Sequence, residues 1–165
     1  MSNPVDVPFA TTWHIRDHCL CLHVQRAARM VARRFDDALR PLGLTNGQFS
    51  LLTSLNRPQS ARMGPLAALL AMDRTTLTAA LKPLERRGLI DVAVDPADRR
   101  NRVLTLTRSG RSLLAAAVPI WKRTHAQVER LLAGADPHVL RRDLRNLSDT
   151  APSPSPAARQ RYRGQ

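Results

Sequence analysis

The chain has 165 residues, 43% of them hydrophobic, so it is long enough to bury the core of one domain. Its 26 Lys and Arg residues against 13 Asp and Glu residues give a formal net charge of +13, which indicates an anionic polymer or a membrane surface as partner. No apolar run of about 18 residues and no signal pattern occurs, so we expect a cytoplasmic protein without a membrane partner.

Residues 1–12 lack a helical pattern and are expected to be irregular. From Trp13 to Leu39 apolar side chains recur every three or four residues, which predicts one long amphipathic helix. Pro41 and Gly43 should end it. The first long helix is therefore expected over about 13–41.

A helix-turn-helix is predicted next. Thr45 is a suitable N-cap for a second helix that stops before Pro58. After a short segment, a third helix is expected over about 65–70, and a turn at Ala71-Met72 then leads into a fourth helix.

The fourth helix carries the first set of candidate DNA contacts. Asp73 can cap it and Gly88 can end it in a left-handed conformation, which predicts a helix over about 74–87. Leu77, Leu81 and Leu84 form its inward stripe. The outward short hydroxyls and cations suit a DNA major groove, where they can reach bases and phosphates. These candidates are Arg74, Thr75, Thr76, Thr78 and Lys82.

A β-hairpin follows, because residues 90–94 and 102–106 both alternate between apolar and polar side chains. The candidate residues of its polar loop are Asp98, Arg99, Arg100 and Arg102. An arginine-tipped hairpin beside a helix-turn-helix is a wing, and guanidinium groups are attracted to a narrow minor groove. The alternative is that these arginines only make the turn soluble.

Thr107 should cap a long fifth helix with Pro119 inside it, and Asp136-Pro137 should open a sixth helix. The Pro- and Arg-rich tail, residues 149–165, is expected to be disordered. The expected fold is mainly α: one winged helix-turn-helix domain over 13–148 with a β-hairpin wing, whose DNA-binding part covers about 45–106.

The terminal helices, about 13–41 and 107–148, have more apolar surface than a small winged domain can cover. They therefore predict a two-fold homodimer whose two recognition helices face a pseudo-palindromic double-stranded DNA operator. The alternative is a monomer with a self-contained helical bundle.

Residues 20–147 closely resemble the MarR (multiple antibiotic resistance regulator) family of winged-helix repressors. The resemblance implies a homodimeric cytoplasmic regulator, usually a repressor that a small ligand or an oxidant releases from DNA. It also implies that Arg100 enters the minor groove and that Asp98 orients it. The segments that carry the resemblance are 42–49, 66–67, 73–78, 84–90, 98–100, 106–107 and Gly110.

The resemblance places a small-molecule effector pocket between the dimer-forming helices and the winged domain, often for aromatic acids or phenols. An arginine among aromatic rings suits an aromatic carboxylate, which it can pair with bidentately. The alternative is that both tryptophans belong to the core or the dimer interface. The effector candidates are Trp13, His14, Arg16, His18, Trp121 and His125.

Cys21 and the neighbouring Cys19 are redox candidates, because Cys21 falls where the organic-hydroperoxide-responsive branch of the family carries its sensing thiol. That branch surrounds the thiol with tyrosines, whereas Gln25, Phe35 and Asn46 occupy those places here. A buried, inert thiol is therefore the expectation, with peroxide sensing as the alternative.

A metal site is a further alternative, since His14, His18 and Cys21 would share one face of a continuous helix at i, i+4 and i+7. Solvated histidines are the simpler interpretation, and we expect no metal and no cofactor. The chain has no Gly-rich phosphate loop, no HExxH motif and no evident catalytic triad, so we do not expect an enzyme. A non-specific architectural DNA-binding protein is the remaining alternative.

Overall fold

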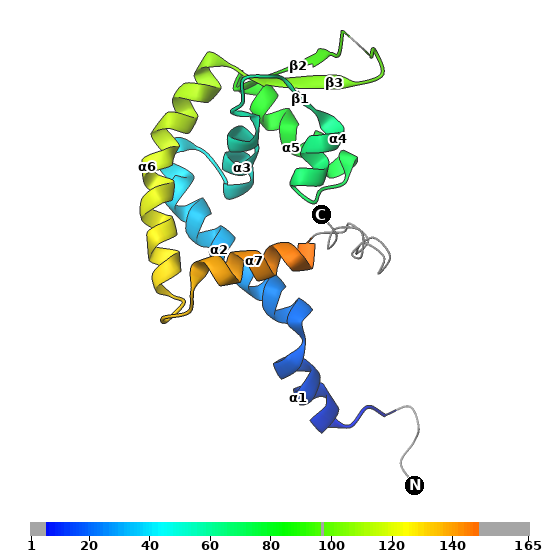
Figure 1. Ribbon diagram of the computed structural model, residues 1–165, viewed down its shortest axis with the longest axis vertical. Coiled ribbons are helices and arrows are strands. Elements are labelled where there is room, and N and C mark those ends of the chain that lie inside the picture. Colours follow the sequence, from blue (N-terminus) through cyan, green and yellow to red (C-terminus); the bar gives the residue numbers. More distant parts are fainter. Residues whose placement is uncertain (1–5, 97, 149–165) are drawn as a thin grey trace, which may run out of the picture. The chain divides into compact units, whose positions relative to one another are not determined.

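The computed structural model describes residues 6–96 and 98–148 (Figure 1). The chain divides into two units on either side of the Val128–Glu129 junction. The expected tail, residues 149–165, lies outside the described residues. The mainly helical, winged fold is confirmed. Its elements are α1 (Phe9–His18), α2 (Leu20–Leu39), η1 (Arg40–Leu42), α3 (Asn46–Leu55), β1 (Ala61–Arg62), α4 (Met63–Leu69), α5 (Arg74–Arg86), β2 (Ile90–Val94), β3 (Arg102–Leu106), α6 (Arg108–Arg130) and α7 (Pro137–Ser148).

The N-terminal helix differs from its prediction in two ways. Helix α1 begins at Phe9, so residues 9–12 are helical where the sequence predicts an irregular segment. The single helix predicted from Trp13 to Leu39 is instead two helices, because Cys19 adopts an extended conformation with φ −72° and ψ 104°. Cys19 is both the C-cap of α1 and the N-cap of α2. No Pro or Gly lies at this break, so the sequence pattern did not indicate it. Helix α1 buries none of its residues, so core packing does not hold it in line with α2.

Helix α3 begins as the sequence predicts. The Thr45 hydroxyl accepts a hydrogen bond from Gln48 N at 3.2 Å, and the Gln48 side chain accepts one from Thr45 N at 3.1 Å. This capping box satisfies two backbone donors that would otherwise lack partners at the helix start. Asp36 of α2 accepts a further bond from Asn46 N at 2.6 Å, which attaches the start of α3 to α2.

A three-stranded antiparallel sheet with the order β1-β3-β2 forms the wing. The hairpin strands β2 and β3 pair over their whole length, from Ile90 opposite Leu106 to Val94 opposite Arg102. Strand β1, which the sequence analysis missed, pairs Arg62 with Val103 and leads directly into α4. A strand of two residues is too short to show an alternating sequence pattern. Helix α4 begins at Met63, directly after β1, rather than near residue 65 as predicted.

The core of the larger unit lies between α2, α3, α5, the sheet and the first half of α6. Its most buried side chains are almost all leucines, which matches the predicted inward stripe of α5. These side chains are Leu39, Leu52, Leu55, Leu66, Leu77, Leu84, Ile90 and Leu104.

The C-terminal end of α5 is attached to both flanking long helices. Arg87 Nη1 donates to the Gly43 carbonyl, just after α2 and η1, at 2.7 Å. The Thr107 hydroxyl donates to the Gly88 carbonyl at 2.7 Å and accepts from Gly110 N at 3.0 Å, so the residue that caps α6 also binds the end of α5. Gly110 lies so close to the Leu89 carbonyl that an added Cβ would be 2.1 Å from its oxygen.

Helix α7 belongs to the smaller unit and begins as predicted, with the Asp136 carboxylate accepting from His138 N at 2.7 Å. Within this unit Arg141 donates to Glu129 at 2.6 Å. None of the helices in the described ranges is long and apolar enough to cross a lipid bilayer.

Candidate nucleic-acid interface

The N-terminal end of α5 is capped by Asp73. Its carboxylate accepts from Thr76 N at 2.8 Å and from the Thr76 hydroxyl at 2.6 Å. Both hydrogen bonds lower the pKa of the Asp73 carboxyl below its ordinary value, and the bond from the Thr76 hydroxyl has the larger effect. At the other end Gly88 has φ +63°, as the sequence predicts. Caps therefore define both ends of the helix, while its outer face stays exposed.

The five predicted α5 candidates are all exposed, but their side chains are engaged to different degrees. Thr76 is committed to the cap, and the Thr78 hydroxyl donates to the Arg74 carbonyl at 2.7 Å, which leaves its oxygen as an acceptor. Within the described ranges, no hydrogen bond or ion pair engages the side chain of Arg74, Thr75 or Lys82. These three side chains can therefore contact an external partner without giving up an internal bond.

The wing loop is ordered by Asp98. Its carboxylate accepts from Arg100 N at 3.0 Å and from Asn101 Nδ2 at 2.8 Å. Asn101 N also donates to the Asp98 carbonyl at 2.8 Å. Asp98 thus holds the backbone of Arg100, the residue that the resemblance leads us to expect it to orient.

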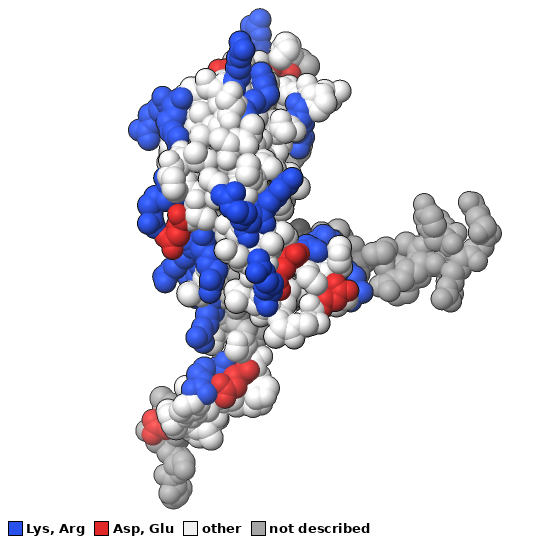
Figure 2. All heavy atoms as spheres, turned by 90° about the vertical axis from the view of Figure 1, so that its left-hand side faces the viewer, with Lys and Arg blue, Asp and Glu red and all other residues white. Residues whose placement is uncertain are grey.

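The three wing arginines point their charge outward. Arg99, Arg100 and Arg102 are exposed, and none forms an ion pair with another described residue. In the view of Figure 2, Lys and Arg side chains are more widespread on the surface than Asp and Glu side chains. Such a field attracts a polyanion at long range, whereas the wing and α5 can supply defined contacts.

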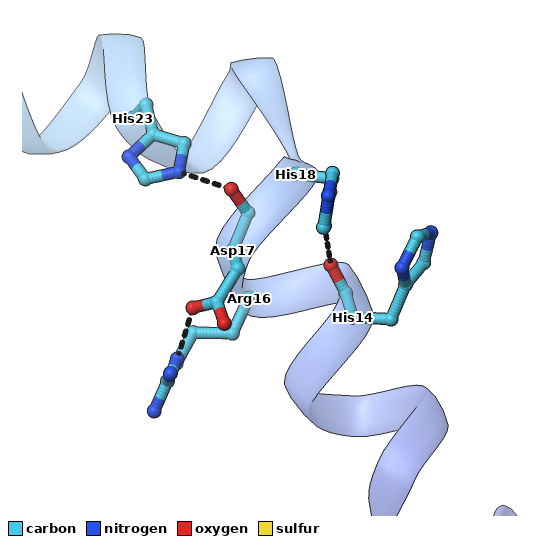
Figure 3. Close-up of polar contacts among 5 residues, drawn as sticks. All are labelled: His14, Arg16, Asp17, His18 and His23. Atoms are coloured by element: carbon cyan, nitrogen blue, oxygen red, sulfur yellow. Dashed lines mark hydrogen bonds and ion pairs between the residues drawn. The ribbon is translucent and has the colours of Figure 1, made fainter.

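The predicted effector residues of α1 form a group of their own. The Arg16 guanidinium lies 3.5 Å from the centre of the Trp13 ring and donates to Asp17 at 2.7 Å. His14 and His18 stack with ring centres 4.2 Å apart, and His23 of α2 donates across the break to the Asp17 carbonyl at 3.1 Å (Figure 3). The Arg16 hydrogen bond lowers the pKa of the Asp17 carboxyl. A ligand carboxylate at Arg16 would therefore compete with Asp17.

The other two effector candidates lie on α6 beside a groove. Trp121 stacks on His125 with ring centres 4.7 Å apart and faces Phe49 at 6.4 Å. The groove has a volume of about 540 Å³. The lining of this groove includes Trp121 but none of the four α1 candidates. The apolar residues that line the groove are Phe49, Leu69, Leu70, Leu114, Val118 and Trp121.

Most of this groove was missed from the sequence. Phe49, Leu114 and Val118 follow the helical apolar spacing of core residues, and that spacing does not reveal which of them border an opening.

The cysteines do not match the expectation of a buried thiol. Cys21 is exposed and its sulfur accepts from Gln25 Nε2 at 3.1 Å, while Cys19 is partly buried at the helix break. The break also removes the continuous helix on which the His14, His18 and Cys21 metal alternative depended. The described part of the chain contains no group of three or more residues that could hold a metal ion.

Comparison with known proteins agrees with this geometry. The sequence model of the MarR family matches residues 44–101, from the start of α3 into the wing loop. The crystal structure of the M. tuberculosis transcriptional regulator MosR in complex with DNA is 40% identical and has a TM-score of 0.70; the match covers 79% of this chain and 94% of MosR. CouR from Rhodococcus jostii RHA1, bound to p-coumaroyl-CoA, is 25% identical with a TM-score of 0.69, covering 83% and 96%.

A curated relative is the transcriptional activatory protein BadR of Rhodopseudomonas palustris. It is 36% identical over 95 residues, which are 56% of this chain and 54% of BadR. The matched region therefore spans about half the length of that relative.

Proposed function

Because this chain belongs to the MarR family of transcriptional regulators, we propose that it binds a pseudo-palindromic operator as a homodimer and represses transcription until a small ligand releases it. The observation that carries the proposal is the capped helix α5, which presents Arg74 and Thr75 beside a wing tipped by Arg99 and Arg100. In such readers the helix enters the major groove and the wing contacts the minor groove.

Exposed apolar side chains support the homodimer. Large hydrophobic residues lie exposed on α1, α2 and α7, where a single chain leaves them in water. A second copy would cover such surfaces through a two-fold axis and would place two α5 helices about one DNA turn, roughly 34 Å, apart. These residues are Phe9, Trp13, Ile15, Leu20, Leu22, Val24, Met30, Val139, Leu140, Leu144 and Leu147.

The groove at Trp121 supports release by an aromatic ligand. Its walls are mainly apolar, and Trp121 and Phe49 offer ring faces on which a planar group can stack. CouR binds an aromatic acyl thioester, and we propose an aromatic acid or its thioester as the ligand class here. Such a ligand releases DNA only if it binds the DNA-free arrangement of the dimer more tightly than the DNA-bound one.

The exposed thiol of Cys21 supports a second candidate, release by peroxide. A thiol must reach solvent to be oxidised, and Cys21 meets that condition in this chain.

The proposal is tested by fluorescence anisotropy on a fragment from the DNA upstream of the gene and on a scrambled duplex of equal length, at near-physiological salt. A sequence-specific regulator should prefer its operator by about 10³-fold or more. Equal affinity for both duplexes would instead identify a non-specific architectural protein. Light scattering on the same sample, with an expected mass of twice 18.4 kDa, tests the dimer.

A further inference from the structure

We propose that Arg62 is an additional DNA-phosphate contact, held in place by the buried carboxylate of Asp95, at the base of the wing. The proposal rests on the DNA-binding function proposed above and adds a residue that neither the α5 pattern nor the wing pattern indicated.

The pairing of Arg62 with Asp95 is the first observation. Arg62 Nε donates to Asp95 Oδ2 at 2.9 Å. The Asp95 side chain is only 4% exposed, whereas the Arg62 side chain is 59% exposed. The pair therefore covers the carboxylate with the Nε edge of the guanidinium and leaves much of the cation facing solvent.

The position of Arg62 is the second observation. It is the last residue of β1, opposite Val103 of the wing strand β3, and α4 begins at the next residue (Figure 1). Gly64, at the start of α4, lies against the guanidinium of Arg74: a Cβ added there would be 3.7 Å from Arg74 Nη2. Arg62 therefore lies between the base of the wing loop and the N-terminal end of α5, the two elements that are proposed to contact DNA.

An opening with polar walls lies beside this arginine. It has a volume of about 500 Å³, and Arg57, Gln59, Ser60 and Arg62 line it together with Asp95. Guanidinium, amide and hydroxyl groups are the donors that phosphate oxygens accept from. Among the described residues that line the opening, Asp95 is the only acidic one, and its carboxylate is covered.

Asp95 holds the Arg62 side chain in one orientation before DNA binds. A free arginine loses side-chain entropy when it binds a phosphate, and that loss reduces the gain from the contact. Arg62 is already oriented by Asp95, and a guanidinium can bind a carboxylate on one edge and a phosphate on another because its five donors point in fixed directions. Lysine, with a single ammonium on a flexible stem, cannot do both.

The test compares Arg62→Gln, Arg62→Lys and the double variant Arg62→Gln/Asp95→Asn with wild type by fluorescence anisotropy, on operator and random duplexes at several salt concentrations. Arg40→Gln is the matched control, because Arg40 is also exposed and paired with a carboxylate, that of Asp37, but lies at the end of α2. Thermal unfolding checks that each variant folds, and the double variant removes the buried charge of Asp95 together with its Arg62 partner.

We expect Arg62→Gln and the double variant to weaken binding about tenfold on both duplexes, since a phosphate contact carries no sequence information. The slope of log K against log[salt] should fall by about one unit. Arg62→Lys should keep the slope but lose affinity, and Arg40→Gln should change neither. Wild-type affinity and slope in a folded double variant would overturn the proposal, as would an effect confined to the operator. If wild type shows no operator preference, the proposed function fails, while the random duplex still decides the role of Arg62.

Discussion

Replacing Gly110 with alanine should destabilise the fold by about 2–4 kcal/mol, although alanine normally favours a helix over glycine by about 1 kcal/mol. The new Cβ would lie 2.1 Å from the Leu89 carbonyl oxygen and 2.8 Å from Leu106 Cδ1, whereas ordinary contact begins at 3.4 Å. The carbonyl would have to retreat by about 1.3 Å, and it now accepts from Thr107 N at 3.1 Å. Overpacking costs about 1–3 kcal/mol and an orphaned buried carbonyl about 1–3 kcal/mol, which together outweigh the gain in helix propensity.

Thermal and urea unfolding followed by circular dichroism measure this effect, at several protein concentrations because a dimer couples stability to concentration. For a chain of this size the loss corresponds to a melting temperature lower by roughly 5–15 °C. Gly47→Ala in α3 is the control, because its Cβ would meet only Thr45 Oγ1 at 3.9 Å, and it should be neutral or mildly stabilising. A Gly110→Ala protein as stable as wild type would refute the close approach of α6 to the end of α5.

Three further outcomes are expected. Arg100→Ala should weaken operator binding by about 1–3 kcal/mol without changing the melting temperature; unchanged affinity by anisotropy would remove the wing from the interface. The Asp73 carboxyl should titrate below its ordinary pKa of 3.8 by NMR and move up toward that value in Thr76→Val, because the folded state favours the charged form. Its stabilising contribution is therefore present above the unfolded pKa and disappears as the pH falls through the folded pKa. A titration that is the same in both proteins would contradict the hydrogen bond from the Thr76 hydroxyl. Cys21→Ser should keep both operator binding and ligand response; if peroxide frees wild type from DNA but not this variant, oxidation is the switch.

The sequence was most informative where local chemistry decides structure. Asp73, Thr45 and Gly88 cap or end helices through bonds to their own neighbours, so their roles followed from residue type and spacing alone. The break at Cys19 had no such signal, because no Pro or Gly lies at it and the extended conformation of a cysteine does not follow from its residue type.

Long-range features lay beyond sequence pattern for a different reason. The Arg62–Asp95 pair joins residues 33 positions apart, and β1 exists only because β3 pairs with it. The α6 candidates Trp121 and His125 were identified by residue type, yet the groove beside them depends on how α3, α4 and α6 meet. The α1 candidates proved to be engaged with one another, and their part in a ligand site remains a prediction.

The attachment of α5 at Gly43 and Gly88 makes that helix a lever with its pivot at the C-terminal end. Its 13 residues span about 20 Å at about 1.5 Å per residue. A tilt of about 10° at the pivot would displace the Arg74 end by about 3 Å, which exceeds the tolerance of a hydrogen bond to a base edge. Small changes in the separation of α2 and α6 would therefore be magnified at the far end of the helix, so the proposed ligand would need to move neither helix far to release DNA.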